Sequence, residues 1–286
     1  MRHVLADYPD LEHFARTNVA YAAAQFVGWE HAESLVWKLK VEQGSAVYLK
    51  AHKQARKFEQ ELFAYQSWIN FKDLAPQVLA IKRAGQRALL LAEVKGEVLE
   101  GLELSEKLWL EVYRQAGSFL AQFHALPYQD TDISLKDAFQ QRLQAWRQRG
   151  RGIVPETDFG LLQAALEKVS SPLKNLRRVP CHRDFSPRNW LWDGSTLRFI
   201  DFEHARADLF LSDLVRLASY YFPRNSSFET AFWQGYGRQL TADEQNLLQY
   251  CCLQEAITTI IWAEEHQDSR FKRMAQQVFE RLRQSL

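Results

Sequence analysis

The chain has 286 residues, of which 47% are hydrophobic, and this composition favours a packed globule of one large domain or two lobes over a disordered chain. The 36 lysine and arginine residues nearly balance the 35 aspartate and glutamate residues, so the charge does not indicate a nucleic-acid or membrane partner. No segment approaches the roughly 18 apolar residues of a membrane helix. Met1–Asp10 lacks the apolar stretch of a signal peptide. The three cysteines have no metal-ligand spacing, and their odd number suits a reducing compartment, so we expect a cytoplasmic protein.

The N-terminal part predicts a helix followed by a β-hairpin. Residues 1–27 have an amphipathic helical pattern, and residues 28–34 form a polar loop with a single glycine. Alternating apolar side chains over residues 35–41 and a second run over residues 46–51 predict two paired strands. Lys50 ends the second strand, where a lysine can reach nucleotide phosphates as a compact positive charge. Ser34 could donate to a phosphate oxygen or serve only as a turn residue.

A helix is predicted next, over residues 54–69. Its apolar face is formed at helical spacing by Phe58, Leu62, Tyr65 and Ile69. A carboxylate at the border of this face could pair with Lys50. At 100° per residue, Glu61 lies slightly nearer the face than Glu59, but the margin is small and either side chain could be merely solvated.

The sequence changes character near residue 94. Residues 76–80 and 87–94 predict two further strands, and the continuous apolar run at 88–92 indicates a buried one. Beyond this point the pattern is mainly helical. We therefore predict a smaller sheet-bearing lobe over residues 1–94 and a larger helical lobe over residues 95–286. Two helical patterns within residues 131–178 could build part of an acceptor site or be solvated helices.

The stretch Cys181–Phe202 carries the chemistry. Two short apolar runs flank Asp193-Gly194-Ser195, a strong hairpin signal. If the hairpin is centred near Ser195, Asn189 and Asp201 face each other with Cβ atoms roughly 5 Å apart. An amide oxygen beside a carboxylate suits Mg²⁺, which takes few protein ligands together with substrate phosphates. Asp184 lies on the loop that leads into the hairpin.

The spacing within this stretch is typical of phosphoryl transfer. HRDFSPRN matches the H-R-D-x-x-x-x-N catalytic loop, and IDF stands where kinases carry D-F-G. In such sites one carboxylate accepts the proton of the attacking hydroxyl, and an Asn and a second Asp hold the metal ions. The alternative is a polar surface hairpin with incidental carboxylates. A helical pattern begins at Leu211, which leaves no room for a long activation segment and favours a small-molecule acceptor over a protein.

The stretch resembles the aminoglycoside phosphotransferase and choline kinase group of small-molecule kinases. That group typically reads H-G-D-x-H-P-x-N or H-R-D-x-H-P-x-N, followed by a hydrophobic pair and I-D-[FW]-E. This chain keeps His182, Asp184, Pro187, Asn189, Asp201 and Glu203, and it departs at Ser186 and Arg188. The resemblance implies an α/β fold of two lobes like that of protein kinases, with a small N-terminal sheet lobe and a larger helical C-terminal lobe.

The resemblance also implies roles for individual residues. Asp184 would orient the acceptor hydroxyl and take its proton, while Asn189 and Asp201 hold Mg²⁺. Lys50, paired with Glu61, would steady the ATP phosphates. The backbone of Glu93 and Val94 would form the hinge that hydrogen-bonds adenine, and Asp213 would bond back to the catalytic loop.

The predicted activity is ATP-dependent transfer of the γ-phosphoryl group to a hydroxyl of a small molecule such as an aminoglycoside, choline or another metabolite. The alternative is a nucleotide-binding regulatory or scaffold protein of the same fold without turnover. Side chains that could line a pocket for a cationic acceptor are Glu255, Trp262, Glu264, Glu265 and Asp268. Carboxylates on exposed helix faces are the commoner case, and the sequence favours none of the five.

Overall fold

The structure, a computed structural model, describes residues 3–28, 33–42, 44–69, 71, 73–128, 133–174 and 176–284. The chain folds into two compact units. Unit 1 consists of Met1–Glu103 with Pro187–Ala205, and unit 2 of Leu104–Ser186 with Arg206–Leu286. The catalytic stretch is therefore divided, because the loop that bears Asp184 belongs to unit 2 and the following hairpin to unit 1. The predicted lobe boundary at residue 94, with a sheet-bearing lobe before it and a helical lobe after it, stays a prediction. In the described part of the chain, no helix is long and apolar enough to cross a membrane.

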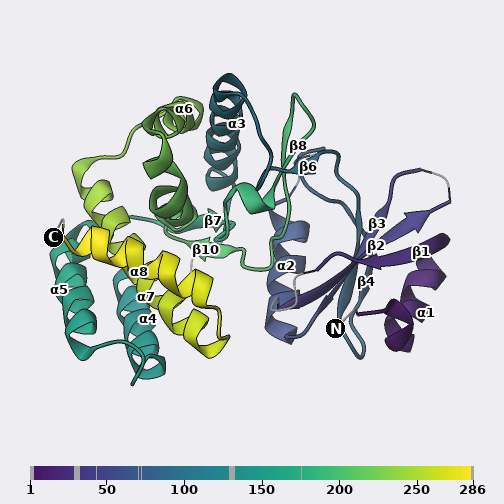
Figure 1. Cartoon of the computed structure of the whole chain (residues 1–286), viewed down its shortest axis with the longest axis horizontal. Helices are drawn as coiled ribbons and strands as arrows, with labels where there is room; N and C mark the ends of the chain where they lie inside the picture. The colour runs from purple at the N-terminus through teal and green to yellow at the C-terminus, as the bar shows by residue number, and fades with distance from the viewer. Residues whose placement is uncertain are drawn as a thin grey trace. The chain divides into compact units, whose positions relative to one another are not determined.

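Unit 1 is built on a five-stranded antiparallel sheet of order β1-β2-β3-β5-β4 (Figure 1). Its strands are β1 Tyr21–Phe26, β2 Ser34–Val41, β3 Val47–His52, β4 Val78–Lys82 and β5 Ala88–Ala92. A smaller sheet of order β6-β8-β9 joins β6 Glu97–Val98 to the hairpin strands β8 Trp190–Trp192 and β9 Leu197–Phe199. The helical elements are η1 Leu5–Asp7, α1 Pro9–Asn18, α2 Ala55–Ser67 and η2 Pro187–Asn189.

Strand β3 is buried on both faces, and each face has its own chemistry. Leu49 and Ala51 join the apolar core that α1 covers. Lys50 and His52 point the opposite way because successive side chains alternate across a strand, and both contact α2. The two helices thus cover opposite faces of the sheet (Figure 1). On the α2 face, the charged side chain of Lys50 reaches the interior.

The predicted helix over residues 1–27 is wrong at its C-terminal end. The helix α1 stops at Asn18, and residues 21–26 form the edge strand β1, paired antiparallel with β2. The alanines at 22–24 fit a helix by propensity, but backbone pairing to β2 overrides that weak preference. The predicted hairpin over residues 35–51 is confirmed as β2 and β3, and the helix at 54–69 as α2. Residues 29–32 of the loop before β2 lie outside the described residues.

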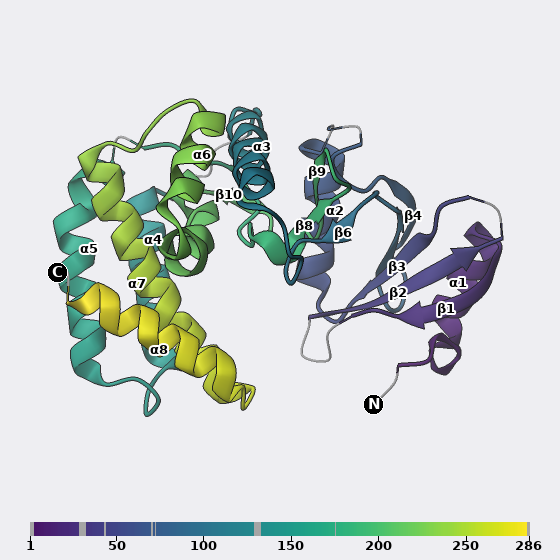
Figure 2. The same cartoon turned by 45° about the horizontal axis from the view of Figure 1, so that its top comes forward.

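Unit 2 is mainly helical (Figure 2). Its α-helices are α3 Glu106–His124, α4 Leu135–Arg149, α5 Glu156–Leu173, α6 Ser226–Tyr236, α7 Ala242–Glu265 and α8 Ser269–Arg283. A two-stranded sheet pairs β7 Val179–Cys181 with β10 Arg206–Asp208. Between β10 and α6 lie the 3₁₀ turns η3 Phe210–Asp213 and η5 Phe222–Arg224 and the π-helical turn η4 Leu217–Tyr221. The long helix α7 packs against α8, α5 and α4.

Helices α3 and α6 approach each other unusually closely. A Cβ added to Gly117 of α3 would fall on the carbonyl oxygen of Phe232 and lie 2.8 Å from the backbone nitrogen of Tyr236. A Cβ on Gly235 of α6 would likewise fall on the carbonyl oxygen of Arg114. The missing side chains at these two glycines let the two backbones touch, which fixes the spacing of the pair.

Candidate active site

In unit 1, one lysine lies among three carboxylates. The Nζ atom of Lys50 is 2.6 Å from Asp201 Oδ1, 2.8 Å from Glu61 Oε2 and 3.2 Å from Glu203 Oε2. Burial alone would lower the pKa of Lys50, but the three carboxylates outweigh it and raise that pKa well above its usual value. With Lys50 protonated, the cluster still has more negative than positive charge.

Glu61, not Glu59, is the partner of Lys50. Glu61 is fully buried and also contacts His52, whose Nε2 lies 2.6 Å from Glu61 Oε2. Burial raises its pKa, yet Lys50 and His52 lower it further, so the net shift is downward. Glu59 is exposed and pairs with Arg83 at 3.2 Å. The predicted Lys50–Glu61 pair is present, and His52 is a second partner of Glu61 that the sequence did not indicate.

The other nucleotide-binding residues predicted in unit 1 have partners within it. Ser34 is buried at the start of β2. Burial raises the pKa of Glu203, although Lys50 and a hydrogen bond with Ser34 act in the opposite direction. The Glu93 carboxylate pairs with Lys38 at 2.7 Å, and the Glu93 backbone N–H donates to the Ala46 carbonyl. An adenine bound at this segment would therefore use the Glu93 carbonyl or the Val94 backbone, and a hinge role for both residues stays a prediction.

The hairpin is confirmed, but its register differs from the prediction by one residue. Trp190 pairs with Phe199 and Trp192 with Leu197, and the Asn189 carbonyl accepts the N–H of Ile200 at 3.0 Å. Asn189 is therefore opposite Ile200 instead of Asp201. The Asp193 carboxylate accepts the N–H groups of Ser195 and Thr196, and this local bonding centres the turn on Gly194-Ser195. Asp201 lies one residue beyond the expected pair, with φ +67°, a conformation that Asp tolerates better than most residues.

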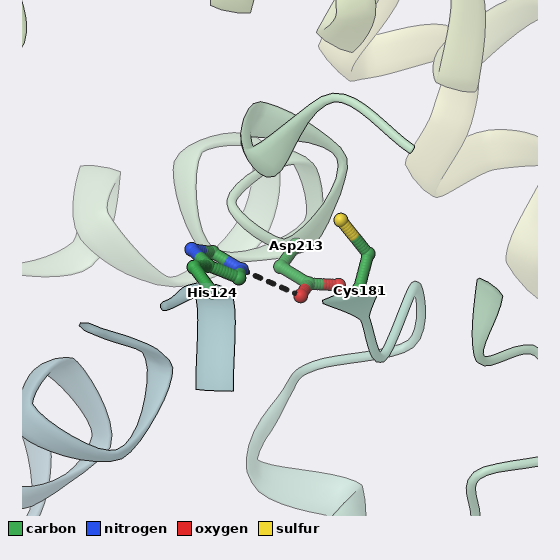
Figure 3. A group of neighbouring side chains, drawn as sticks. All are labelled: His124, Cys181 and Asp213. Atoms are coloured by element: carbon green, nitrogen blue, oxygen red, sulfur yellow. Dashed lines mark hydrogen bonds and ion pairs between the residues drawn. The ribbon is translucent and has the colours of Figure 1, made fainter. Parts of the chain in front are cut away.

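In unit 2, Asp213 holds the backbone of the catalytic loop. Its carboxylate accepts the N–H of His182 at 2.9 Å and the N–H of Arg183. His124 Nε2 lies 3.0 Å from the same carboxylate (Figure 3). His124 Nδ1 lies 2.9 Å from the Tyr236 hydroxyl. The bond from Asp213 back to the catalytic loop, which the resemblance implies, agrees with these contacts.

Cys181 lies on the other side of Asp213 from His124 (Figure 3). The three side chains come close enough to share a metal ion. However, both Asp213 oxygens already accept hydrogen bonds, and the Cys181 thiol faces the carbonyl oxygens of Asp208 and Leu209. Burial raises the pKa of this thiol well above its usual value, which disfavours the thiolate that a metal needs. The cluster is a hydrogen-bonded support for the loop.

The side chain of Arg183 makes a second attachment of the loop to unit 2. It adopts φ +66°, a conformation that favours the glycine found there in H-G-D sequences, and its guanidinium contacts Asp208. Arg142 and Arg206 reach the same Asp208 oxygen at 2.7 and 3.5 Å. Burial raises the pKa of Asp208, but the three guanidinium groups outweigh it and hold that pKa far below its usual range. Arg183 therefore serves as an ion-pair partner within unit 2.

Asp184 itself is buried and paired with an arginine. The Nε atom of Arg216 lies 2.7 Å from Asp184 Oδ1, and Arg216 Nη2 lies 3.5 Å from Glu255 Oε1. Of the five side chains considered for an acceptor pocket, Glu255 contacts this group through Arg216. Glu264 and Glu265 pair with Lys272 and Arg149, Asp268 caps α8, and Trp262 stacks on His266. Sequence reasoning missed Arg216, whose one signal is its place three residues after Asp213.

These two groups of residues, a buried lysine held by a helix glutamate in unit 1 and a supported His-Arg-Asp loop in unit 2, are those expected of a phosphotransferase of the kinase type. The chain belongs to the phosphotransferase enzyme family, whose sequence model matches residues 24–248. The resemblance stated from the catalytic stretch is thereby confirmed. A search of curated proteins found no match.

Solved structures with a similar fold include aminoglycoside phosphotransferases and their complexes. The GDP and kanamycin complex of APH(2")-IIia is 13% identical, with 98% of this chain and 99% of that chain covered and a TM-score of 0.75. A thermostable mutant of aminoglycoside phosphotransferase APH(4)-Ia is 15% identical, covers 96% and 98%, and has a TM-score of 0.73. Spectinomycin phosphotransferase APH(9)-Ia, in complex with ADP and spectinomycin, is 13% identical, covers 96% and 93%, and has a TM-score of 0.62. At these identities the likeness confirms the predicted kinase-like fold.

Proposed function

We propose that this protein is an ATP- and Mg²⁺-dependent kinase that transfers the γ-phosphoryl group to a hydroxyl of a small molecule. The observation that carries the proposal is the buried Lys50, which is held by Glu61 and contacts Asp201. Burying a lysine without a partner costs free energy of folding. A lysine that pairs with two carboxylates on different elements is compensated and fixed in place. Its partner Asp201 is the carboxylate of the I-D-F sequence, so the lysine and the proposed metal ligand belong to one ionic cluster.

The residues present fit a divalent cation. Lys50 is one positive charge against three carboxylates, which are Asp201, Glu61 and Glu203. Oxygen ligands with surplus negative charge are what Mg²⁺ prefers. In the proposed function Asn189 and Asp201 hold Mg²⁺, which would neutralise charge on the nucleotide phosphates when bound. Lys50 steadies those phosphates, with Ser34 near them and Glu93 and Val94 at the adenine.

Asp184 is the proposed catalytic residue. It is 3% exposed, and Arg216 pairs with one of its carboxylate oxygens. In the proposed function this carboxylate orients the acceptor hydroxyl and accepts its proton. The short chain after Asp201 supports a small acceptor. The strand β10 begins at Arg206 and η3 begins at Phe210, so the chain between Asp201 and Phe210 is too short for an activation segment. The similar solved structures, whose complexes contain kanamycin or spectinomycin, make aminoglycosides the first acceptors to test. We further propose a cytoplasmic location, which the three buried free thiols support.

The test is ATP-dependent phosphorylation across a panel of aminoglycosides, choline, ethanolamine, thiamine and small sugars, with Asp184→Ala as the control. Turnover on one acceptor that the variant abolishes supports the kinase and names its substrate class. Turnover that survives in the variant contradicts the role of Asp184. Tight Mg·ATP binding with no turnover on any acceptor favours the regulatory or scaffold alternative. Absence of Mg·ATP binding contradicts the roles of Lys50, Asn189 and Asp201.

A further inference from the structure

A short segment of unit 2, from the end of η3 to the residue before η4, contacts three consecutive residues of the catalytic loop. Asp213 is the last residue of η3, and Arg216 directly precedes η4. Asp213 accepts the N–H groups of His182 and Arg183, while Arg216 pairs with the Asp184 carboxylate. The backbone before Asp184 and the side chain of Asp184 are thus fixed by one short segment.

Two carboxylates hold Arg216 itself in place. Its guanidinium lies between two carboxylates, at 2.7 Å from Asp184 and 3.5 Å from Glu255 on α7. Burial would lower the pKa of Arg216, but these two carboxylates raise it, so the group is a permanent cation. The π-helical turn Leu217–Tyr221 begins at the next residue. Such turns are rare in proteins as a whole, and those that occur are often found at functional sites.

The position of this cation has a chemical consequence. A guanidinium on one oxygen of Asp184 limits rotation of the carboxylate. Phosphoryl transfer depends mainly on positioning and charge, so the orientation of this carboxylate matters for the rate. A displacement of about 1 Å at a reacting group can cost roughly 100-fold in rate.

We propose that Arg216 is a positioning residue that fixes the Asp184 carboxylate for catalysis, and that Glu255 holds Arg216 in that place. This inference rests on the proposed function, in which Asp184 is the catalytic residue. Arg216 touches neither nucleotide nor acceptor in this proposal. Its removal should therefore lower kcat and leave the KM for ATP nearly unchanged.

The test measures phosphate release from Mg·ATP without an added acceptor, so that it does not depend on the acceptor's identity, and repeats it with any acceptor found. We expect Arg216→Ala to lower kcat roughly 100-fold, with the KM for ATP within about threefold. Guanidinium at millimolar concentration should restore at least part of the loss, whereas urea and sodium chloride should not. Glu255→Gln should lower kcat less, because the contact with Asp184 remains. Arg238→Ala, which removes an arginine paired with Glu244, should leave kcat near that of the parent and show no response to guanidinium.

Thermal melting separates positioning from folding. If Arg216→Ala is too unstable to assay, Arg216→Lys replaces it, and we expect a folded protein with reduced kcat and unchanged KM. Kcat within twofold of the parent in either variant, or a loss that guanidinium fails to restore in a folded Arg216→Ala protein, would overturn the positioning role. Activity that survives Asp184→Asn would instead overturn the proposed function, as would a parent protein with neither phosphate release nor transfer.

Discussion

The ion pair between Lys50 and Glu61 should contribute measurably to stability, and Glu61→Gln tests it. Removing one partner of a buried pair typically costs about 3–5 kcal/mol. Lys50 keeps Asp201 at 2.6 Å and Glu203 at 3.2 Å, so we expect the lower end, about 3 kcal/mol. The surplus of carboxylates could in principle reverse the sign. The lowered pKa of Glu61 decides against that, because it shows that attraction to Lys50 and His52 exceeds repulsion by Asp201.

The assay is thermal unfolding of the parent, Glu61→Gln and the matched control Glu59→Gln. At about 2–4 °C per kcal/mol, Glu61→Gln should lower Tm by about 6–12 °C. Glu59 pairs with Arg83 on the surface, so its replacement should cost no more than about 1 kcal/mol. The folded-state pKa of Glu61 is lowered, so its stabilisation is complete above its ordinary pKa of 4.5 and is lost as the pH falls below that value. The Tm difference should therefore be full at pH 7 and shrink in acid. Equal Tm values for the two variants, or a difference that grows in acid, would refute the reasoning.

Three further predictions concern unit 2. Gly117→Ala should lower Tm, since overpacking typically costs about 1–3 kcal/mol, while Gly160→Ala, where a Cβ meets open space in α5, should raise it slightly; equal effects would contradict the close α3–α6 contact. Asp208→Asn should lower the free energy of unfolding by about 3–5 kcal/mol at pH 7. Because the folded-state pKa of Asp208 is lowered, this loss should shrink in acid, below its ordinary pKa of 3.8. Acid unfolding curves of the variant and the parent measure the difference. The three free cysteines are buried, and burial raises the pKa of Cys252 to about 12, so a thiol reagent should label all three only after denaturation; rapid labelling of the native protein would contradict this.

The spacing of apolar residues predicted the elements whose conformation depends mainly on their own residues. The apolar spacing over residues 54–69 gave α2, and the side chains Phe58, Leu62 and Tyr65 are indeed buried. The strand β1 could not be found this way. Its residues 21–26 are partly exposed and rich in alanine, and their conformation depends on pairing with β2, which is a contact between segments.

The candidate site shows the same limit at finer scale. The predicted hairpin is present between Asn189 and Asp201, but its register depended on how the Asp193 carboxylate closes the turn, a detail that a count from Ser195 does not include. The helical pattern separated Glu61 from Glu59 by only a small margin, and the family resemblance decided between them. Arg216 and Glu255 are 39 positions apart in the printed numbering and meet only through folding, so no spacing rule joins them.

The charge balance around Lys50 bears on how the proposed kinase would bind a nucleotide. In unit 1 this lysine faces three carboxylates. The group keeps its cation engaged and carries surplus negative charge, which would repel a polyphosphate. Lys50 alone is therefore a poor anchor for ATP in this protein. In the proposed function the divalent cation is needed for binding as well as for catalysis, because it turns repelling carboxylates into ligands that the nucleotide and the protein share.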